Sequence, residues 1–397
     1  MIIIKNATVH TMETEKAINN GFVVTEGQKI VFVGDVKTDA EKLKAYEKTA
    51  DTVIDAKGKF VFPGFVDAHT HLGIANSGLR WEGADYNEIS DPVTPHMRCI
   101  DGIYGFDETF HDTMIGGVTT VVVTPGSANV IGGNMCAIKT GGSQVVDDLV
   151  VDANLAIKCA LGENPKNVFG QAQKKTPFTR MASAALLREA LIKTKEYETR
   201  KKNETKDKPV DINVKWEALL PVIRREIPIH IHCHRADDIC TALRIGKEFN
   251  IKMILVHASE GHLVAEKIKE SGYPAIIGPT MTHKSKPEVK NKGFGTLKSL
   301  LDLGVLACTT TDHPVIPLQH LNVCASLTVQ AGLDEYRALQ AITTNAAEIM
   351  GIADKVGSLK VGNDADIVIW DKHPFDATSQ ATTVVINGKV VFENDKQ

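Results

Sequence analysis

The chain has 397 residues, of which 43% are hydrophobic and 24% are charged, as in an ordinary globular protein. Its formal net charge of −4 offers no broad basic surface, so we expect no nucleic-acid partner. The N-terminal residues are apolar only briefly, and no uninterrupted apolar run reaches the length needed to span a bilayer. We therefore expect a cytoplasmic protein that acts on a small-molecule substrate without binding a membrane.

The seven cysteines are an odd number spread widely along the chain. Several of them, such as Cys159 and Cys308, stand in apolar runs. This usage favours buried free thiols over a disulfide framework.

Short β-rich runs alternate with turn residues at both ends of the chain. The runs are residues 2–9, 21–25, 30–33, 53–55 and 60–62 at the start, and 365–370, 382–386 and 389–392 at the end. Asn387-Gly388 is a strong hairpin turn between the last two runs. We expect residues 1–62 and 352–397 to form together one small β domain, a β-sandwich.

Between these ends, β-branched runs alternate with longer helical stretches, a pattern typical of βα units around a parallel sheet. Seven candidate strands are residues 65–69, 118–123, 155–161, 228–232, 251–257, 275–277 and 305–310. An eighth is expected around residues 137–139 or among the less regular residues between 72 and 117. The predicted fold class is α/β, with a (β/α)8 TIM-type barrel over residues 63–351. Within it, the charged residues 193–215 predict an exposed helix end and loop before the fifth strand.

The first local signal of function is the run from Phe62 to Leu72. Alternate side chains of a strand share one face, so His69 and His71 project together and can present two imidazoles to one metal. A lone His-x-His is a weak signal, because such pairs are more often surface or satisfied histidines. Here the pair follows an apolar strand that is entered through Pro-Gly, which favours the metal site.

Three segments together resemble the amidohydrolase superfamily, in particular the branch that contains imidazolonepropionase and prolidase-like relatives. They are residues 63–71, 117–121 and 356–366, and they follow one another over almost the whole chain. The resemblance implies a barrel whose strand ends supply the ligands of one or two divalent ions, with zinc as the expected metal.

The resemblance also implies ligands on the fifth strand, where residues 229–235 carry three histidines on one face. The spacing to Ile239 favours His232 as the ligand. His234 then lies farther out, near the substrate or in support of the ligands, and His230 is packed deeper in the barrel.

Two further ligands are implied at the ends of later strands. His257 follows a buried apolar run, where an uncompensated polar group is costly, and is the second ligand of the pair with His232. Asp312 ends the eighth strand and is the expected metal ligand and general base. An aspartate that caps the following helix is the alternative role for Asp312.

A bridging carboxylate between two metals is the ambiguous position, because relatives use a carboxylated lysine, a glutamate or no bridge there. Lys158 stands in an apolar strand, where a free ammonium is expensive to bury, which indicates modification, pairing or orientation toward the metal. Glu163 lies nearer the strand end and needs no modification. We favour Glu163, because ligands gather at the barrel mouth.

Two other polar residues are candidates for contacting the substrate or supporting the ligands. Asn134 ends a glycine-rich loop, residues 124–134, whose backbone amides can approach a ligand closely. His283 follows the seventh strand and can polarise a carbonyl or bind a carboxylate. A plain turn-rich connection and an ordinary exposed loop histidine are the alternatives.

The reaction that the resemblance implies is cleavage of the C–N bond of a cyclic or peptide-like amide through metal-activated hydroxide. A mononuclear metal-dependent deaminase is the first alternative. A non-catalytic barrel scaffold is the second, and the coherent ligand set that ends in Asp312 argues against it. The sequence is also compatible with a homo-oligomer.

Overall fold

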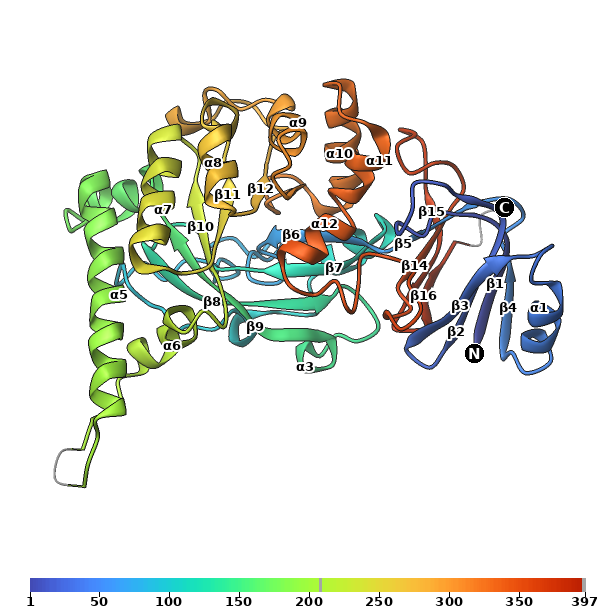
Figure 1. Ribbon diagram of the computed structural model, residues 1–397, viewed down its shortest axis with the longest axis horizontal. Helices are drawn as coiled ribbons and strands as arrows, with labels where there is room; N and C mark the ends of the chain where they lie inside the picture. Colours follow the sequence, from blue (N-terminus) through green and yellow to red (C-terminus); the bar gives the residue numbers. More distant parts are fainter. Residues whose placement is uncertain (207–208, 395–397) are drawn as a thin grey trace.

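The computed structural model describes residues 1–206 and 209–394, which form two eight-stranded sheets. Figure 1 shows the larger sheet with its covering helices on the left and the smaller sheet, built from both chain ends, on the right. The predicted α/β barrel with a composite β domain is confirmed.

The larger sheet is a nearly closed barrel in which strands that follow one another in the chain are hydrogen-bonded neighbours. Its strands are β6 (Phe65–Thr70), β7 (Val118–Val123), β8 (Ile131–Lys139), β9 (Val150–Ala160), β10 (Ile229–Cys233), β11 (Met253–His257), β12 (Ala275–Ile277) and β13 (Ala307–Thr309). The seven candidate strands of the sequence are therefore all present.

The eighth strand is β8, which contains residues 137–139, one of the two places expected for it. It runs antiparallel to both β7 and β9, so this part of the barrel is a meander and not a βα unit. Parallel neighbours need a crossover of about a dozen residues or more, and the connections on either side of β8 are too short for one.

Helices cover the outside of the barrel. They are α2 (Thr109–Ile115), α5 (Arg180–Lys202), α6 (Val214–Ile223), α7 (Ala236–Phe249), α8 (Ala265–Ser271), α9 (Gly295–Asp302), α10 (Leu321–Gln330), α11 (Glu335–Gln340) and α12 (Thr344–Ile349). The alternating side chains of β10 show which face of the barrel these helices bury. Ile229 and Ile231 face outward into a core shared with Ile245 of α7, so His230 and His232 point to the barrel interior.

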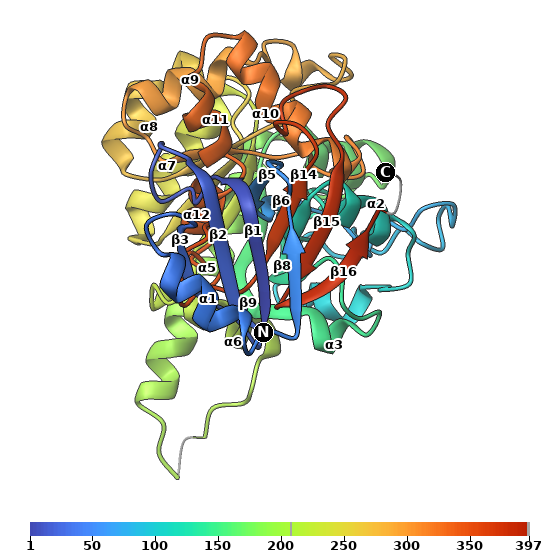
Figure 2. The same cartoon turned by 90° about the vertical axis from the view of Figure 1, so that its right-hand side faces the viewer.

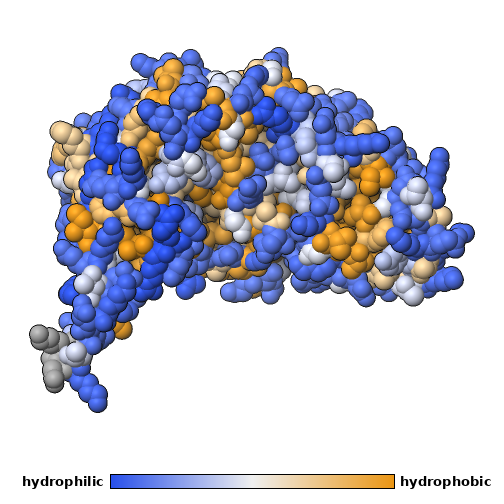
Figure 3. Space-filling model, viewed as in Figure 1, coloured by the Kyte–Doolittle hydropathy of each residue, from blue (hydrophilic) through white to orange (hydrophobic). Residues whose placement is uncertain are grey.

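The helix α5 begins at the cap Thr179, whose hydroxyl accepts a hydrogen bond of 3.1 Å from the Ala182 amide. Its C-terminal half extends away from the body of the molecule, and its surface is largely hydrophilic (Figures 1 and 3). The described part of the charged stretch from residue 193 is thus an exposed helix end and loop, as predicted.

The smaller sheet joins the two ends of the chain (Figure 2). Its order is β16 (Lys389–Glu393), β15 (Ala381–Ile386), β14 (Ile367–Trp370), β5 (Phe60–Pro63), β1 (Ile2–Val9), β2 (Ile18–Glu26) and β3 (Lys29–Asp35), and β4 (Thr52–Asp55) also pairs with β1. The two ends meet where β5 and β14 pair antiparallel. One apolar cluster contains Val23 of β2 together with Ile367 of β14, so the two halves of the sheet share a core. The domain boundaries after residues 62 and 351 stay predictions.

Two predictions from composition can also be compared with the structure. Among the described residues, no helix has the length and apolar character that crossing a membrane requires. All seven cysteines are described and free, and all except Cys240 are buried, which confirms the predicted free thiols.

Candidate metal centre

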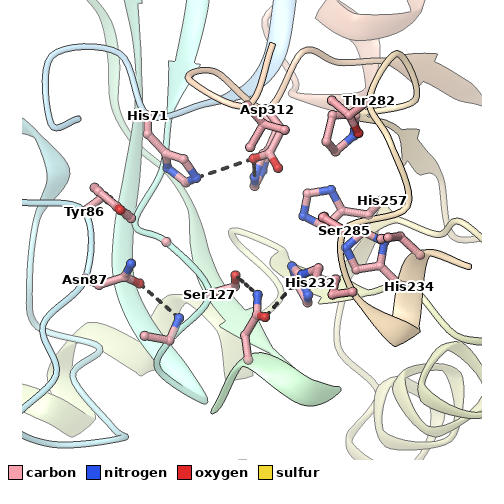
Figure 4. Close-up of a pocket in the computed structure, with 18 of the residues that line it drawn as sticks. His71, Tyr86, Asn87, Ser127, His232, His234, His257, Thr282, Ser285 and Asp312 are labelled. Carbon is pink, nitrogen blue, oxygen red and sulfur yellow. Dashed lines mark hydrogen bonds and ion pairs between the residues drawn. The ribbon is translucent and has the colours of Figure 1, made fainter. Parts of the chain in front are cut away.

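Two groups of potential metal ligands lie at the carboxyl ends of the barrel strands. The first is His69, His71 and Asp312, and the second is His232, His234 and His257. Within each group, one ligand atom per residue lies within 4.8 Å of the others. Both groups line one pocket of about 350 Å³ (Figure 4). This volume suits a small organic molecule.

The first group combines β6 with the segment that follows β13. His69 lies in β6 and His71 directly follows the last residue of that strand. The Nε2 atoms of these histidines lie 3.2 Å and 3.5 Å from Asp312 Oδ1. The Nδ1 atom of His71 lies 2.7 Å from the carbonyl oxygen of Thr124. Because a carbonyl only accepts, Nδ1 carries the proton and Nε2 presents a lone pair to the pocket.

Asp312 is held in a restricted conformation at the barrel mouth. Its φ of 54° lies in the left-handed region that side chains other than glycine rarely adopt. Burial alone would raise its pKa, but the neighbouring imidazoles of His257, His69 and His71 hold the pKa of Asp312 well below its usual range. The carboxylate is therefore ionised at neutral pH.

The second group comes from β10, β11 and the turn after β10. His257 Nδ1 lies 2.7 Å from the Gly278 carbonyl oxygen, so its Nε2 is also unprotonated. His234 Nδ1 is 2.8 Å from Ser259 Oγ, and His232 Nδ1 is buried with no hydrogen-bond partner. Burial lowers the pKa values of all three histidines, which keeps them neutral and able to bind a metal.

The structure brings five of the expected residues together, namely His69, His71, His232, His257 and Asp312. It places His234 directly in the second group, and not only behind the ligands. His230 lies deeper, fully buried, with Nε2 2.8 Å from His69 Nδ1 and its ring stacked on that of His69.

Lys158 of β9 lies between the two groups. It is 1% exposed, and its Nζ is 3.3 Å from His69 Nε2. In the described part of the chain it forms no ion pair, and burial lowers its pKa to about 8. Its charge lowers the pKa of His69 in the first group and of His232 and His257 in the second, so it is close to both.

Glu163 is not brought to either group, against the preference drawn from the sequence. It begins α4 (Glu163–Pro165), just after Gly162, whose φ of 83° turns the chain away from the strand. Its carboxylate accepts a 3.0 Å hydrogen bond from the Glu288 amide, and its own amide donates one of 3.0 Å to the Glu288 carboxylate. Of the two candidates for the bridging position, Lys158 is the one whose side chain lies beside a ligand group.

The other two candidates lie outside the pocket lining. Asn134 is on β8, where its side chain hydrogen-bonds Asn154 of β9. His283 is exposed, and its carbonyl oxygen accepts a hydrogen bond from Lys292. Neither position contacts the two ligand groups.

Two buried carboxylates at the site were not predicted from the sequence. Asp67 of β6 accepts hydrogen bonds from the Thr310 hydroxyl at 2.5 Å and the Thr311 amide at 2.9 Å, and so links β6 to the end of β13. Burial raises the pKa of Asp67 to about 6. Glu288 is fully buried in η4 (Pro287–Val289), and its Oε1 lies 3.1 Å from His232 Nε2. An acidic residue inside an apolar strand was a usable signal for Asp67, whereas Glu288 had none.

Comparison with known proteins identifies the family to which this barrel belongs. The profile of the amidohydrolase family matches residues 60–391. A solved amidohydrolase from Thermotoga maritima is 38% identical and superposes with a TM-score of 0.93, covering 99% of this chain and 100% of that one.

Two curated relatives are similar over nearly the whole of this chain. Amidohydrolase tasK of Hapsidospora irregularis is 30% identical over 99% of this chain, which spans only 43% of the length of that relative. Imidazolonepropionase of Shouchella clausii is 25% identical, over 95% of this chain and 86% of its own. The chain belongs to the amidohydrolase family, which confirms the resemblance and supports a general hydrolase activity on C–N bonds.

Proposed function

We propose that this protein is a metal-dependent hydrolase that cleaves the C–N bond of a cyclic or peptide-like amide. The observation that carries the proposal is the convergence of two ligand groups, one of which includes an ionised aspartate, on a single pocket. The family relatives make a hydrolase the expected class, and we infer a cytoplasmic setting from the composition.

The residues present fit divalent metal. The Nε2 atoms of His71 and His257 are lone-pair donors, because Nδ1 of each ring donates to a carbonyl oxygen. His232 Nδ1 is a buried nitrogen without a partner. Imidazoles and a carboxylate suit zinc, which is the metal we propose. His69, His71 and Asp312 would hold one ion, and His232, His234 and His257 another.

Lys158 is our candidate for the bridge, in carboxylated form. Carboxylation requires the neutral amine, and a pKa of about 8 leaves about a tenth of the lysine neutral at pH 7. An anionic side chain at this position would also relieve the cost of burying an unpaired ammonium.

Bound metal would supply Lewis acidity to the substrate carbonyl and to the attacking water. The protein supplies the proton transfers. Asp312 can accept a proton from the attacking water on its carboxylate and deliver it to the leaving nitrogen. The hydrogen bonds that Thr310 and Thr311 donate to the Asp67 carboxylate fix the segment that carries Asp312.

The test combines metal analysis with a substrate screen. The purified chain is assayed for metal content, then stripped, reloaded and offered cyclic amides, N-acyl amino acids and dipeptides. We expect metal-dependent hydrolysis, and a loss of about 10²- to 10⁴-fold in kcat for Asp312→Asn. The exposed Asp101→Asn is the control and should keep full activity. Hydrolysis that persists in the stripped protein would contradict the proposal, and ammonia release from an aromatic substrate would identify a deaminase instead.

A further inference from the structure

The segment between β12 and α9 carries four lysines, Lys284, Lys286, Lys290 and Lys292. Lys286 and Lys292 line the pocket of the two ligand groups, whereas Lys284 and Lys290 are exposed on the outside. The pocket wall therefore receives two ammonium groups from one short segment.

The two lysines of the wall differ in how their charge is balanced. Lys286 Nζ lies 2.5 Å from Glu288 Oε1, a fully buried carboxylate, so its charge is neutralised inside the protein. It also donates to Asn164 Oδ1 at 3.2 Å. Lys286 is thus a structural partner of Glu288.

Lys292 has no such counterion. Its Nζ donates to the Thr282 hydroxyl and, at 3.0 Å, to the His283 carbonyl oxygen, which are both neutral. In the described part of the chain it forms no ion pair. Partial burial, together with the charges of Lys284 and Lys286, lowers its pKa, as expected for a cation in an uncompensated positive field.

The hydroxyls beside Lys292 complete a polar wall. Thr282 and Ser285 line the pocket on the side of His257 and His234, opposite Tyr86 and Asn87 (Figure 4). Asp312 is the single acid among the described lining residues, and it belongs to the first ligand group. A ligand anion on this wall would therefore lie beside one unpaired positive charge, and apart from Asp312 the described lining presents no carboxylate to repel it.

The wall is also fixed in place. Glu163 and Glu288 exchange two backbone-to-carboxylate hydrogen bonds, and Asn291 donates to Glu260 Oε1 at 2.7 Å. A binding site whose groups are already held in position loses less entropy when a ligand binds.

We propose that Lys292, with the hydroxyls of Thr282 and Ser285, binds a carboxylate of the substrate, so that the natural substrate is an anionic amide such as an N-acyl amino acid or a dipeptide. A single unpaired ammonium matches the single charge of a carboxylate. This inference rests on the proposed hydrolase function, which it narrows to amides that carry an acid group.

The test measures binding separately from turnover. Matched pairs of N-acetyl amino acids and their carboxamides, with alanine, leucine, phenylalanine and proline side chains, are titrated calorimetrically into the metal-replete full chain. We expect at least one acid to bind about 10- to 100-fold more tightly than its carboxamide. Lys292→Met should abolish that preference, Lys292→Arg should retain most of it, and the exposed Lys284→Met should leave it unchanged.

Lys292→Gln provides a second neutral variant if Lys292→Met fails to fold. A preference for the acids that persists in both neutral variants would overturn the proposal, because the carboxylate would then be held by the metal or another group. Equal affinity for every acid and its carboxamide, or no binding of any acid, would overturn it too. Lysine-dependent binding without hydrolysis would support the subsite and count against the proposed reaction.

Discussion

Two neighbouring barrel strands each bury a lysine, and the surroundings of the two lysines shift their pKa values in opposite directions. Lys139, the last residue of β8, has its Nζ 2.6 Å from Asp366 and 2.9 Å from Asp364. Burial opposes its charge, but the two carboxylates prevail and raise its pKa. Among the described residues, the polar partner of the Lys158 Nζ is a histidine nitrogen, and burial lowers the pKa of Lys158 to about 8.

The direction of the strands explains this difference. Because β8 is antiparallel, its C-terminal residue pairs with Thr120 near the start of β7, at the amino end of the barrel. There Lys139 meets the segment that leads into β14 and ties the barrel to the composite sheet. Lys158 pairs with His230 and lies toward the ligand groups. In (β/α)8 barrels, residues at the amino end of the strands contribute to stability, whereas residues at the carboxyl end carry out the chemistry.

Lys139→Met should give the largest effect, and the effect should be on stability. The substitution leaves the buried Asp366 without its cation, whereas Asp364 keeps its ion pair with Lys29. Breaking a buried pair in this way costs about 3–5 kcal/mol of unfolding free energy. Urea titration measures the loss, and metal content of the folded fraction should stay at the wild-type value. A fall in bound metal with unchanged stability would reverse the roles assigned to the two lysines.

Lys158→Met should give the converse result. We expect about a 10- to 100-fold loss of activity together with reduced bound metal, because a group beside the ligands is removed. The stability of the metal-free chain in urea should stay the same or rise, since in that state an unpaired buried ammonium is replaced by an apolar side chain of similar length. Mass spectrometry under native conditions also tests the proposed carboxylation, which adds the mass of CO₂.

Glu163→Gln separates the two bridging candidates. The neutral side chain can still accept the hydrogen bond from the Glu288 amide, so we expect metal content to be retained and stability to fall by about 1 kcal/mol or less. Measuring metal per chain in this variant and in Lys158→Met compares them directly. Loss of metal in Glu163→Gln but not in Lys158→Met would instead support Glu163 as the bridging ligand.

The first ligand group could be predicted from sequence because its chemistry is local. His69 and His71 share a strand face by the two-residue period, and Asp312 follows an apolar strand directly. The same reasoning located every parallel strand of the barrel, because buried parallel strands are continuous apolar runs.

The other features of the site and of the barrel depend on tertiary contacts, which no local sequence pattern encodes. Lys158 and Glu163 are only five positions apart, and the turn at Gly162 decides which of them stays in the barrel. Glu288 reaches His232 from a short turn of 3-10 helix far along the chain. The direction of β8 was also hidden, because an antiparallel and a parallel buried strand share the same composition.

His10 shows a third way to bury a titratable group, which is to keep it neutral. Its ring stacks on Phe62 with centroids 4.3 Å apart, and burial, together with the charge of His373, lowers its pKa from 6.5 to about 4. The unfolded chain therefore binds more protons than the folded chain between these values, so stability is fully present above about pH 6.5 and is lost as the pH falls toward 4.

His10→Phe should reduce that acid-side loss by about 1 kcal/mol, a value that allows for solvent screening of a partly exposed ring. Urea titrations of both proteins at pH 7.5, 6 and 4.5 measure it as the difference between the two stability curves. Parallel curves would mean that folding does not shift the pKa of His10. The ion pairs of Lys139 are common to both proteins, so their contribution to stability cancels in this difference. The difference therefore measures the contribution of the neutral buried His10 separately from that of the paired Lys139.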